Sequence, residues 1–175
     1  MSIEPIYTRF PKVPIERRAA AFLIDFVGVW LLSSLAGGNF LFQSLVFILF
    51  WLGMRVALVS RNLGQSLGGW ALDIKVLDAN GKIPGLLTLA KREGILGSCA
   101  LLAMIGFGIG LANPISFLVL TAPLAADCCM ALGDSEAQQA FHDRIAKTYM
   151  IQTRRGFSLD IRLKKLFAQM KRRMK

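Results

Sequence analysis

The sequence predicts an all-α membrane protein with four transmembrane helices and with both termini in the cytoplasm. Of its 175 residues, 54% are hydrophobic and only 18% are charged, which is too apolar for an ordinary soluble domain of this length. The apolar residues also gather in runs long enough to cross the roughly 30 Å hydrocarbon core of a bilayer as helices. We predict spans at about 19–36, 40–59, 94–112 and 115–132.

The positions of the basic residues predict how these spans are oriented. The turns at 37–39 and 113–114 contain no Lys or Arg, whereas the leader 1–18, the connector 60–93 and the tail after the fourth span (133–175) contain every one except Arg55. Cytoplasmic loops carry the excess of Lys and Arg, so leader, connector and tail are expected in the cytoplasm. A three-span alternative would place the basic tail outside, which the same rule disfavours.

Three ionisable residues interrupt the predicted spans near their cytoplasmic ends: Asp25, Arg55 and Asp127. At the centre of a transmembrane helix such a side chain costs about 2.5–3.5 kcal/mol, so we expect these residues to face other helices. We predict an intramembrane charge cluster in which Asp25 and Asp127 flank Arg55. The cluster is either a structural link between helices or an ion or proton site.

The connector predicts a short cytoplasmic β-hairpin at about 70–84. Residues 72–76 alternate between apolar and polar side chains, which is typical of a half-buried strand. Asn80 and Gly81 then provide a turn, and Ile83 would belong to the second strand. A strand-like segment at 149–151 could pair with this hairpin.

Residue types that carry catalysis or hold metals are sparse in this chain. His142 is the only histidine, and the three cysteines contain no CxxC pair. The glycine-rich segment 64–69 lacks the Lys-Ser/Thr ending of a phosphate-binding loop. We therefore expect no enzymatic activity, no metal and no cofactor. Asp143 or Arg144, beside His142, is expected to bond the connector, with proton relay by His142 as the alternative.

The tail, residues 152–175, predicts a basic amphipathic helix. Residues 154–175 contain nine Lys or Arg and one Asp, so this segment carries +8 of the formal charge of +10. Leucines recur in it at helical spacing, and we expect the helix to lie on anionic lipid head groups. An acidic protein or RNA is the alternative partner of the tail, although nucleic acid is not expected for the chain as a whole. The predicted lipid-surface residues are Lys164, Lys165, Lys171, Arg172 and Arg173.

Four pieces of the chain together resemble the RDD family of bacterial membrane proteins, named for one arginine and two aspartates. These are RRAAAFLID, GQSLGGWALDIKVLDANGKIPG, Arg92 and FHDRIAKT, and the likeness runs from about residue 17 to residue 151. Arg18 and Asp25 match the family's arginine and first aspartate. The second aspartate is Asp127, Asp134 or Asp143. The residues that match the family motif are Arg18, Asp25, Gly64, Gln65, Gly68, Arg92, His142, Asp143 and Thr148.

The chain departs from the family pattern at two positions. The family usually has a basic residue where Gly69 stands and a small residue where Asp73 stands, which weakens any expectation of an anion contact in that loop. The resemblance implies a polytopic protein of the bacterial inner membrane, or of another energy-transducing membrane, with a four-span domain at 19–151. It also implies transport of small solutes or ions, an activity often proposed for such proteins.

Two functions are consistent with these observations. The first is a small solute or ion transporter, working as a homo-oligomer because four short spans enclose little space. The second is a noncatalytic accessory or assembly subunit of a larger membrane complex, with the hairpin and the basic tail as its docking surfaces.

Overall fold

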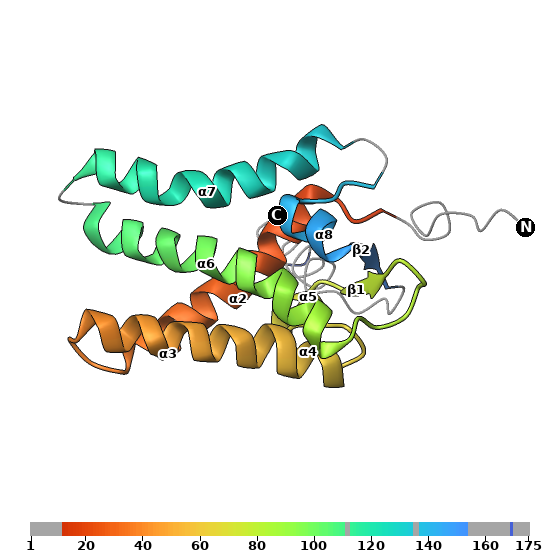
Figure 1. The fold of residues 1–175 in the computed structure, drawn as a ribbon, viewed down its shortest axis with the longest axis horizontal. Coiled ribbons are helices and arrows are strands. Elements are labelled where there is room, and N and C mark those ends of the chain that lie inside the picture. Colours follow the sequence, from red (N-terminus) through yellow and green to blue (C-terminus); the bar gives the residue numbers. More distant parts are fainter. Residues whose placement is uncertain (1–11, 111–112, 135–136, 154–168, 170–175) are drawn as a thin grey trace, which may run out of the picture.

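Long helices that run side by side make up most of this computed structural model, which describes residues 12–110, 113–134, 137–153 and 169 (Figure 1). A smaller region at one end holds the short helices and the strands. The elements are, in order, α2 (Ile15–Ser34), α3 (Phe40–Leu52), the π-helical turn η1 (Gly53–Ala57), α4 (Leu58–Arg61), α5 (Leu67–Ala71), β1 (Ile74–Asp78), α6 (Leu86–Gly110), α7 (Pro114–Gly133), α8 (Phe141–Ala146) and β2 (Thr148–Gln152).

Two asparagines begin two of the long helices in the same way. Asn39 accepts hydrogen bonds from the backbone N–H groups of residues 41 and 42, and Asn113 accepts them from residues 115 and 116. An amide oxygen at the N-cap satisfies donors that the first turn of a helix leaves unpaired. Both uncharged junctions lie at the end of the molecule opposite the strands (Figure 1).

Three helical segments in the described part are long and apolar enough to cross a membrane: Phe40–Arg61, Leu86–Gly110 and Pro114–Gly133. The last two are separate helices packed side by side, so residues 94–132 do not form a single bent helix. The helix predicted from residue 94 already begins at Leu86. α2 is of similar length but carries four charged residues, and its membrane crossing remains a prediction.

An apolar core fills the space between α2, α3 and α6 in the half of the bundle away from the strands. Its buried members include Phe26 and Val29 of α2, Phe47 and Trp51 of α3, and Ala100 of α6. Aromatic rings stack or meet edge to face within it. Apolar packing therefore stabilises this half of the bundle.

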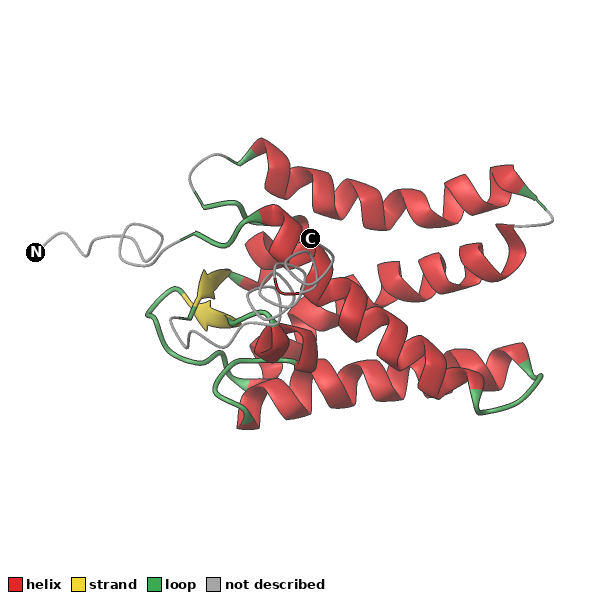
Figure 2. Ribbon diagram, turned by 180° about the vertical axis from the view of Figure 1, so that it is seen from behind, coloured by secondary structure: helices red, strands yellow, loops and turns green. Residues whose placement is uncertain are grey.

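The predicted β-hairpin is wrong, because the partner of β1 comes from far along the chain. β1 pairs antiparallel with β2, with Ile74 opposite Gln152 and Asp78 opposite Thr148. After β1, the carboxylate of Asp78 accepts hydrogen bonds from the N–H groups of Asn80 and Lys82, both 2.8 Å long, and closes a tight turn. The pairing of segment 149–151 with this strand is confirmed; Figure 2 shows the two strands beside the helix ends.

The short helix α5 lies directly against α2, and Gly68 makes this approach possible. A Cβ atom at Gly68 would lie 2.0 Å from the carbonyl oxygen of Ala21. Ser66 caps α5 by accepting a hydrogen bond from the N–H of Gly69. The connector is thus in backbone contact with a long helix, and any side chain at residue 68 would push the two apart.

Apart from residues 152, 153 and 169, the predicted basic amphipathic helix of the tail lies outside the described residues, as do all five of its lipid-surface residues. The proposed contact of Lys164, Lys165, Lys171, Arg172 and Arg173 with anionic lipid stays a prediction.

We expect Gly68→Ala to lower the stability of the folded protein by about 3 kcal/mol, because overpacking at a backbone contact costs about 1–3 kcal/mol. The measurement is the thermal unfolding midpoint of the purified protein in detergent. Gly28→Ala is the matched control, since nothing lies within 4 Å of a Cβ atom at that position of α2. An unchanged midpoint for Gly68→Ala would mean that α5 does not rest on α2.

Candidate functional site

Arg55 is buried at the centre of the π-helical turn η1 and joins two other helices through ion pairs. Its Nη1 donates to a carboxylate oxygen of Asp25 on α2 at 2.6 Å, and its Nε donates to Glu93 on α6 at 2.7 Å. The guanidinium also lies 5.1 Å from the centre of the Trp51 ring, a cation–π distance. π-helical turns often occur at functional sites, and this one carries the residue that links three helical segments.

Asp25 uses both carboxylate oxygens at this junction. One accepts the bond from Arg55, and the other accepts a hydrogen bond from the backbone N–H of Gly68 at 2.7 Å. The carboxylate is fully buried, so it depends on these two donors for compensation of its lost hydration. Asp25 therefore connects α2 both to the bundle and to the connector.

Arg92 extends the ion pairs toward α8. Its Nη1 bonds the neighbouring Glu93, and its Nε donates to a carboxylate oxygen of Asp143 at 2.8 Å. The other oxygen of Asp143 accepts from Arg18 at 2.5 Å, and Arg18 also donates to the carbonyl of Gln138. The result is a chain of alternating charges, which we call the ion-pair chain: Asp25, Arg55, Glu93, Arg92, Asp143 and Arg18.

The prediction that Asp127 flanks Arg55 is wrong. Asp127 lies on α7 and bonds His142 instead, accepting from its backbone N–H at 2.9 Å and lying 2.6 Å from its Nδ1. The short helix α8 packs against both α6 and α7, and this places His142 beside Asp127. The second partner of Arg55 is Glu93, which the sequence analysis missed.

The missed residue had a detectable signal. The span predicted from residue 94 leaves Glu93 in the polar connector, yet the helix already begins at Leu86. An Arg92-Glu93 pair inside an extended helix would have required buried partners, which Arg55 and Asp143 provide.

Of the three aspartates considered for the second family position, only Asp143 contacts Arg18 in the described structure. Asp127 bonds His142, and Asp134 lies 3.4 Å from the half-exposed Arg144. Burial alone would raise the pKa of the Asp143 carboxyl, but Arg92, His142 and Arg18 outweigh burial and hold this pKa well below its ordinary range. Asp143 is therefore a permanent anion at neutral pH.

The remaining family-motif residues support the site rather than belong to the ion-pair chain. The Gln65 side chain donates to the carbonyl of Ile74 at 3.0 Å, and the carbonyl of Gly64 accepts from Val76 at 2.8 Å. Gly64 has a φ of +84°, a conformation that favours glycine. Thr148 donates to Asp143 at 3.3 Å, at the start of β2. These contacts fix β1 and α8 against the helix ends.

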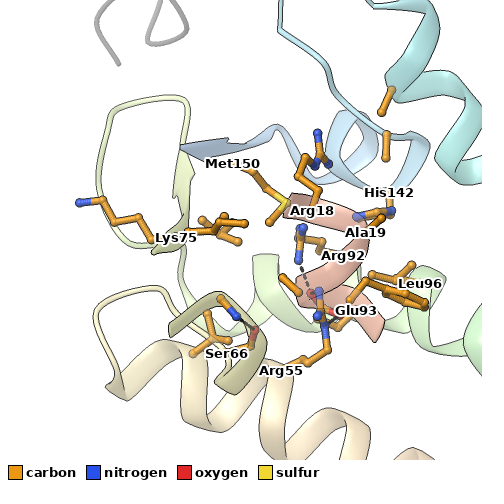
Figure 3. A pocket seen from close by; sticks show the side chains of 18 of the residues that line it. Arg18, Ala19, Arg55, Ser66, Lys75, Arg92, Glu93, Leu96, His142 and Met150 are labelled. Carbon is orange, nitrogen blue, oxygen red and sulfur yellow. Dashed lines mark hydrogen bonds and ion pairs between the residues drawn. The ribbon is translucent and has the colours of Figure 1, made fainter. Parts of the chain in front are cut away.

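A cavity of about 280 Å³ lies beside the ion-pair chain. Arg18, Arg55, Arg92, Glu93 and His142 line it together with apolar side chains from α2, α6, α7 and both strands, and Figure 3 shows how these side chains converge. The described residues contain no group of three or more His, Cys, Asp or Glu side chains placed to hold a metal ion. The site thus offers buried charges and a small cavity.

We expect Asp143→Asn to destabilise the folded protein by about 3–5 kcal/mol near neutral pH, since it leaves two buried guanidinium groups without their shared carboxylate. The pH dependence should follow from the lowered pKa. A carboxyl group whose pKa is lowered by folding stabilises the folded protein at pH values above its unfolded-state pKa of about 3.9. This stabilisation is lost as the pH falls below that value.

The difference in unfolding midpoint between wild type and Asp143→Asn should therefore be constant above about pH 5 and shrink below about pH 4. Glu16→Gln serves as the control, since Glu16 is exposed in the first turn of α2. A difference that grew on acidification would contradict the proposed charge state of Asp143.

Comparison with protein families identifies one match. A model of the RDD family matches residues 12–147, which is most of the chain and includes every member of the ion-pair chain. Comparisons with curated proteins and with solved structures give no match.

Proposed function

Because this chain belongs to the RDD family, we propose that it is a noncatalytic integral membrane protein that moves a small solute or ion. The ion-pair chain would be the part that responds to the transported species. The observation that carries the proposal is the burial of Asp25, Arg55 and Glu93 between helices. Ionisable groups inside a helical bundle are costly and commonly mark transport routes.

The ion-pair chain would respond to the transported species when one of its carboxylates is neutralised. A proton or cation at Asp25 or Glu93 would leave Arg55 with a single anionic partner and would weaken one of its two helix connections. Arg55 bonds α2 on one side and α6 on the other, so the loss of either bond favours a different packing of these helices. The bound species and the helix arrangement are then coupled.

We propose the bacterial inner membrane, or another energy-transducing membrane, as the location, with the end that carries the strands in the cytoplasm. The support is the charge pattern. The two junctions without Lys or Arg lie together at one end of the bundle, and the described basic loop residues lie at the other.

A route across the membrane would have to involve more than the described interior of one copy. The half of the bundle away from the strands is filled by Phe26, Phe47, Trp51 and their apolar neighbours. The outer face of α7 is apolar and exposed, with Leu118 and Val119 among its residues. Homo-oligomerisation through such a face would create a path between copies.

The transport proposal predicts that Asp25→Asn slows flux at least about tenfold per copy of folded protein. Purified protein would be reconstituted in vesicles that contain a pH-sensitive dye, and proton movement would be measured after an imposed Na⁺ or K⁺ gradient. Wild type should move protons at least about ten times faster than the variant, if charge at Asp25 lowers the barrier by about 1.4 kcal/mol or more. Asp78→Asn, outside the ion-pair chain, is the control. Equal rates for all three proteins and empty vesicles would contradict this form of transport.

A second candidate function is that of an accessory or assembly subunit of a larger membrane complex. Two observations support this function. The apolar core offers no path for a solute through one copy, and the exposed apolar face of α7 suits contact with another protein.

This second function predicts that the protein, extracted gently at its native level, migrates with unrelated subunits in a large complex. Replacing exposed Leu118 by Asn should then release it, by weakening an apolar contact, whereas the exposed Leu87→Asn at the start of α6 should not. Migration as a small homo-oligomer would instead favour transport.

A further inference from the structure

One nitrogen of the buried Arg92 side chain has no hydrogen-bond partner among the described residues. Arg92 is 1% exposed, its Nε bonds Asp143 and its Nη1 bonds Glu93, but its Nη2 makes no hydrogen bond with the protein that the structure describes. A buried donor without an acceptor is costly, and native structures rarely keep one without a reason. Arg92 is also one of the residues that line the 280 Å³ cavity, so a ligand held there could supply the acceptor that Nη2 lacks.

The wall of this cavity is richer in cations than in anions. Arg18 and Arg55 line it beside Arg92, and among the described residues Glu93 is the only carboxylate in the wall. Asp25 and Asp143, which balance these arginines, do not line the cavity. Figure 3 shows Arg92 among the other wall side chains, while the nitrogen of Lys75 points away from it. An oxyanion in the cavity would therefore lie among three arginines and one carboxylate.

The mouth of the cavity lies between α2 and α7. Three described wall residues are exposed, and they are Ala19 and Leu23 of α2 and Cys128 of α7. The outward faces of both helices are apolar near this point, with Leu23, Ile24 and Leu132 exposed. In a membrane protein such faces contact lipid, so the mouth opens toward the bilayer at the level of the ion-pair chain.

We propose that this cavity binds the phosphate group of a membrane lipid, with Arg92 Nη2 as the principal donor. Arginine is well suited to phosphate, because its planar group donates charge-assisted hydrogen bonds. The cavity volume suits a phosphate and its glycerol linkage, and the acyl chains leave between α2 and α7. Carboxylates already balance the charges of the guanidinium groups. The phosphate is therefore held by the hydrogen bond from Arg92 Nη2 and not by excess positive charge. Free inorganic phosphate could accept the same hydrogen bonds and is the alternative ligand.

This proposal assumes that the helices lie in a membrane but does not depend on transport. Binding is measured on the full chain in detergent as the thermal unfolding midpoint, with three probes added separately. These are dioctanoyl phosphatidylglycerol, dioctanoylglycerol, which has the same chains without phosphate, and sodium phosphate. At about ten times the dissociation constant, phosphatidylglycerol should raise the midpoint of wild type by about 3 °C, and dioctanoylglycerol should not.

Two variants place the effect in the cavity. Ala19→Phe should block the mouth and remove the shift, whereas Val27→Phe, on the exposed side of α2 but outside the cavity wall, should keep it. Arg92→Lys keeps a positive charge but loses the second nitrogen, and should remove the shift as well. All variants retain the basic tail, so nonspecific attraction of anionic lipid is the same in each.

A shift with sodium phosphate alone would support the phosphate site but identify its source as the soluble anion. A shift of equal size with dioctanoylglycerol would overturn the proposal, because the acyl chains alone would then explain it. Equal shifts in wild type and Ala19→Phe, or no shift with any probe, would overturn it too. None of these outcomes bears on flux, so the transport proposal stands or fails separately.

Discussion

The bond of Arg55 to two buried carboxylates is the interaction on which the rest of this structure depends. A guanidinium at this depth loses its hydration, a loss of several kcal/mol that only well-placed anions can offset. Asp25 and Glu93 provide these anions from two different helices, at 2.6 and 2.7 Å. The positions of α2, η1 and α6 are therefore set by charge at one end of the bundle, while apolar side chains set them at the other.

The same constraint extends into the loops. Asp25 binds the N–H of Gly68, and this contact is possible because residue 68 has no side chain to separate α5 from α2. Asp143 links α8 to Arg18 at the start of α2 and to Arg92 in α6. Segments that the sequence separates into leader, connector and post-membrane region thus form one electrostatic unit, and a change at any of its charges affects several elements.

Prediction from sequence succeeded where local chemistry decides the structure. Long apolar runs predicted helices, Asn113 with Pro114 predicted the break between α6 and α7, and alternating side chains predicted β1. It failed where partners lie far apart in the chain. β1 pairs with β2 some 70 residues later, and Arg55 takes Glu93 rather than Asp127. The strand partner is not visible locally, and the partner of Arg55 depended on the true start of α6 at Leu86.

The sequence by itself determined the class of protein. Long apolar runs favour transfer into lipid, and Lys and Arg are absent from one set of turns, and both properties depend on local sequence alone. It also determined that Asp25 and Arg55 needed buried partners. Only the tertiary structure decided which partners they have, which strand completes the sheet, and that Arg92, which lines a cavity, keeps one nitrogen without a hydrogen-bond partner among the described residues. These are properties of distance between elements, and packing of the helices sets those distances.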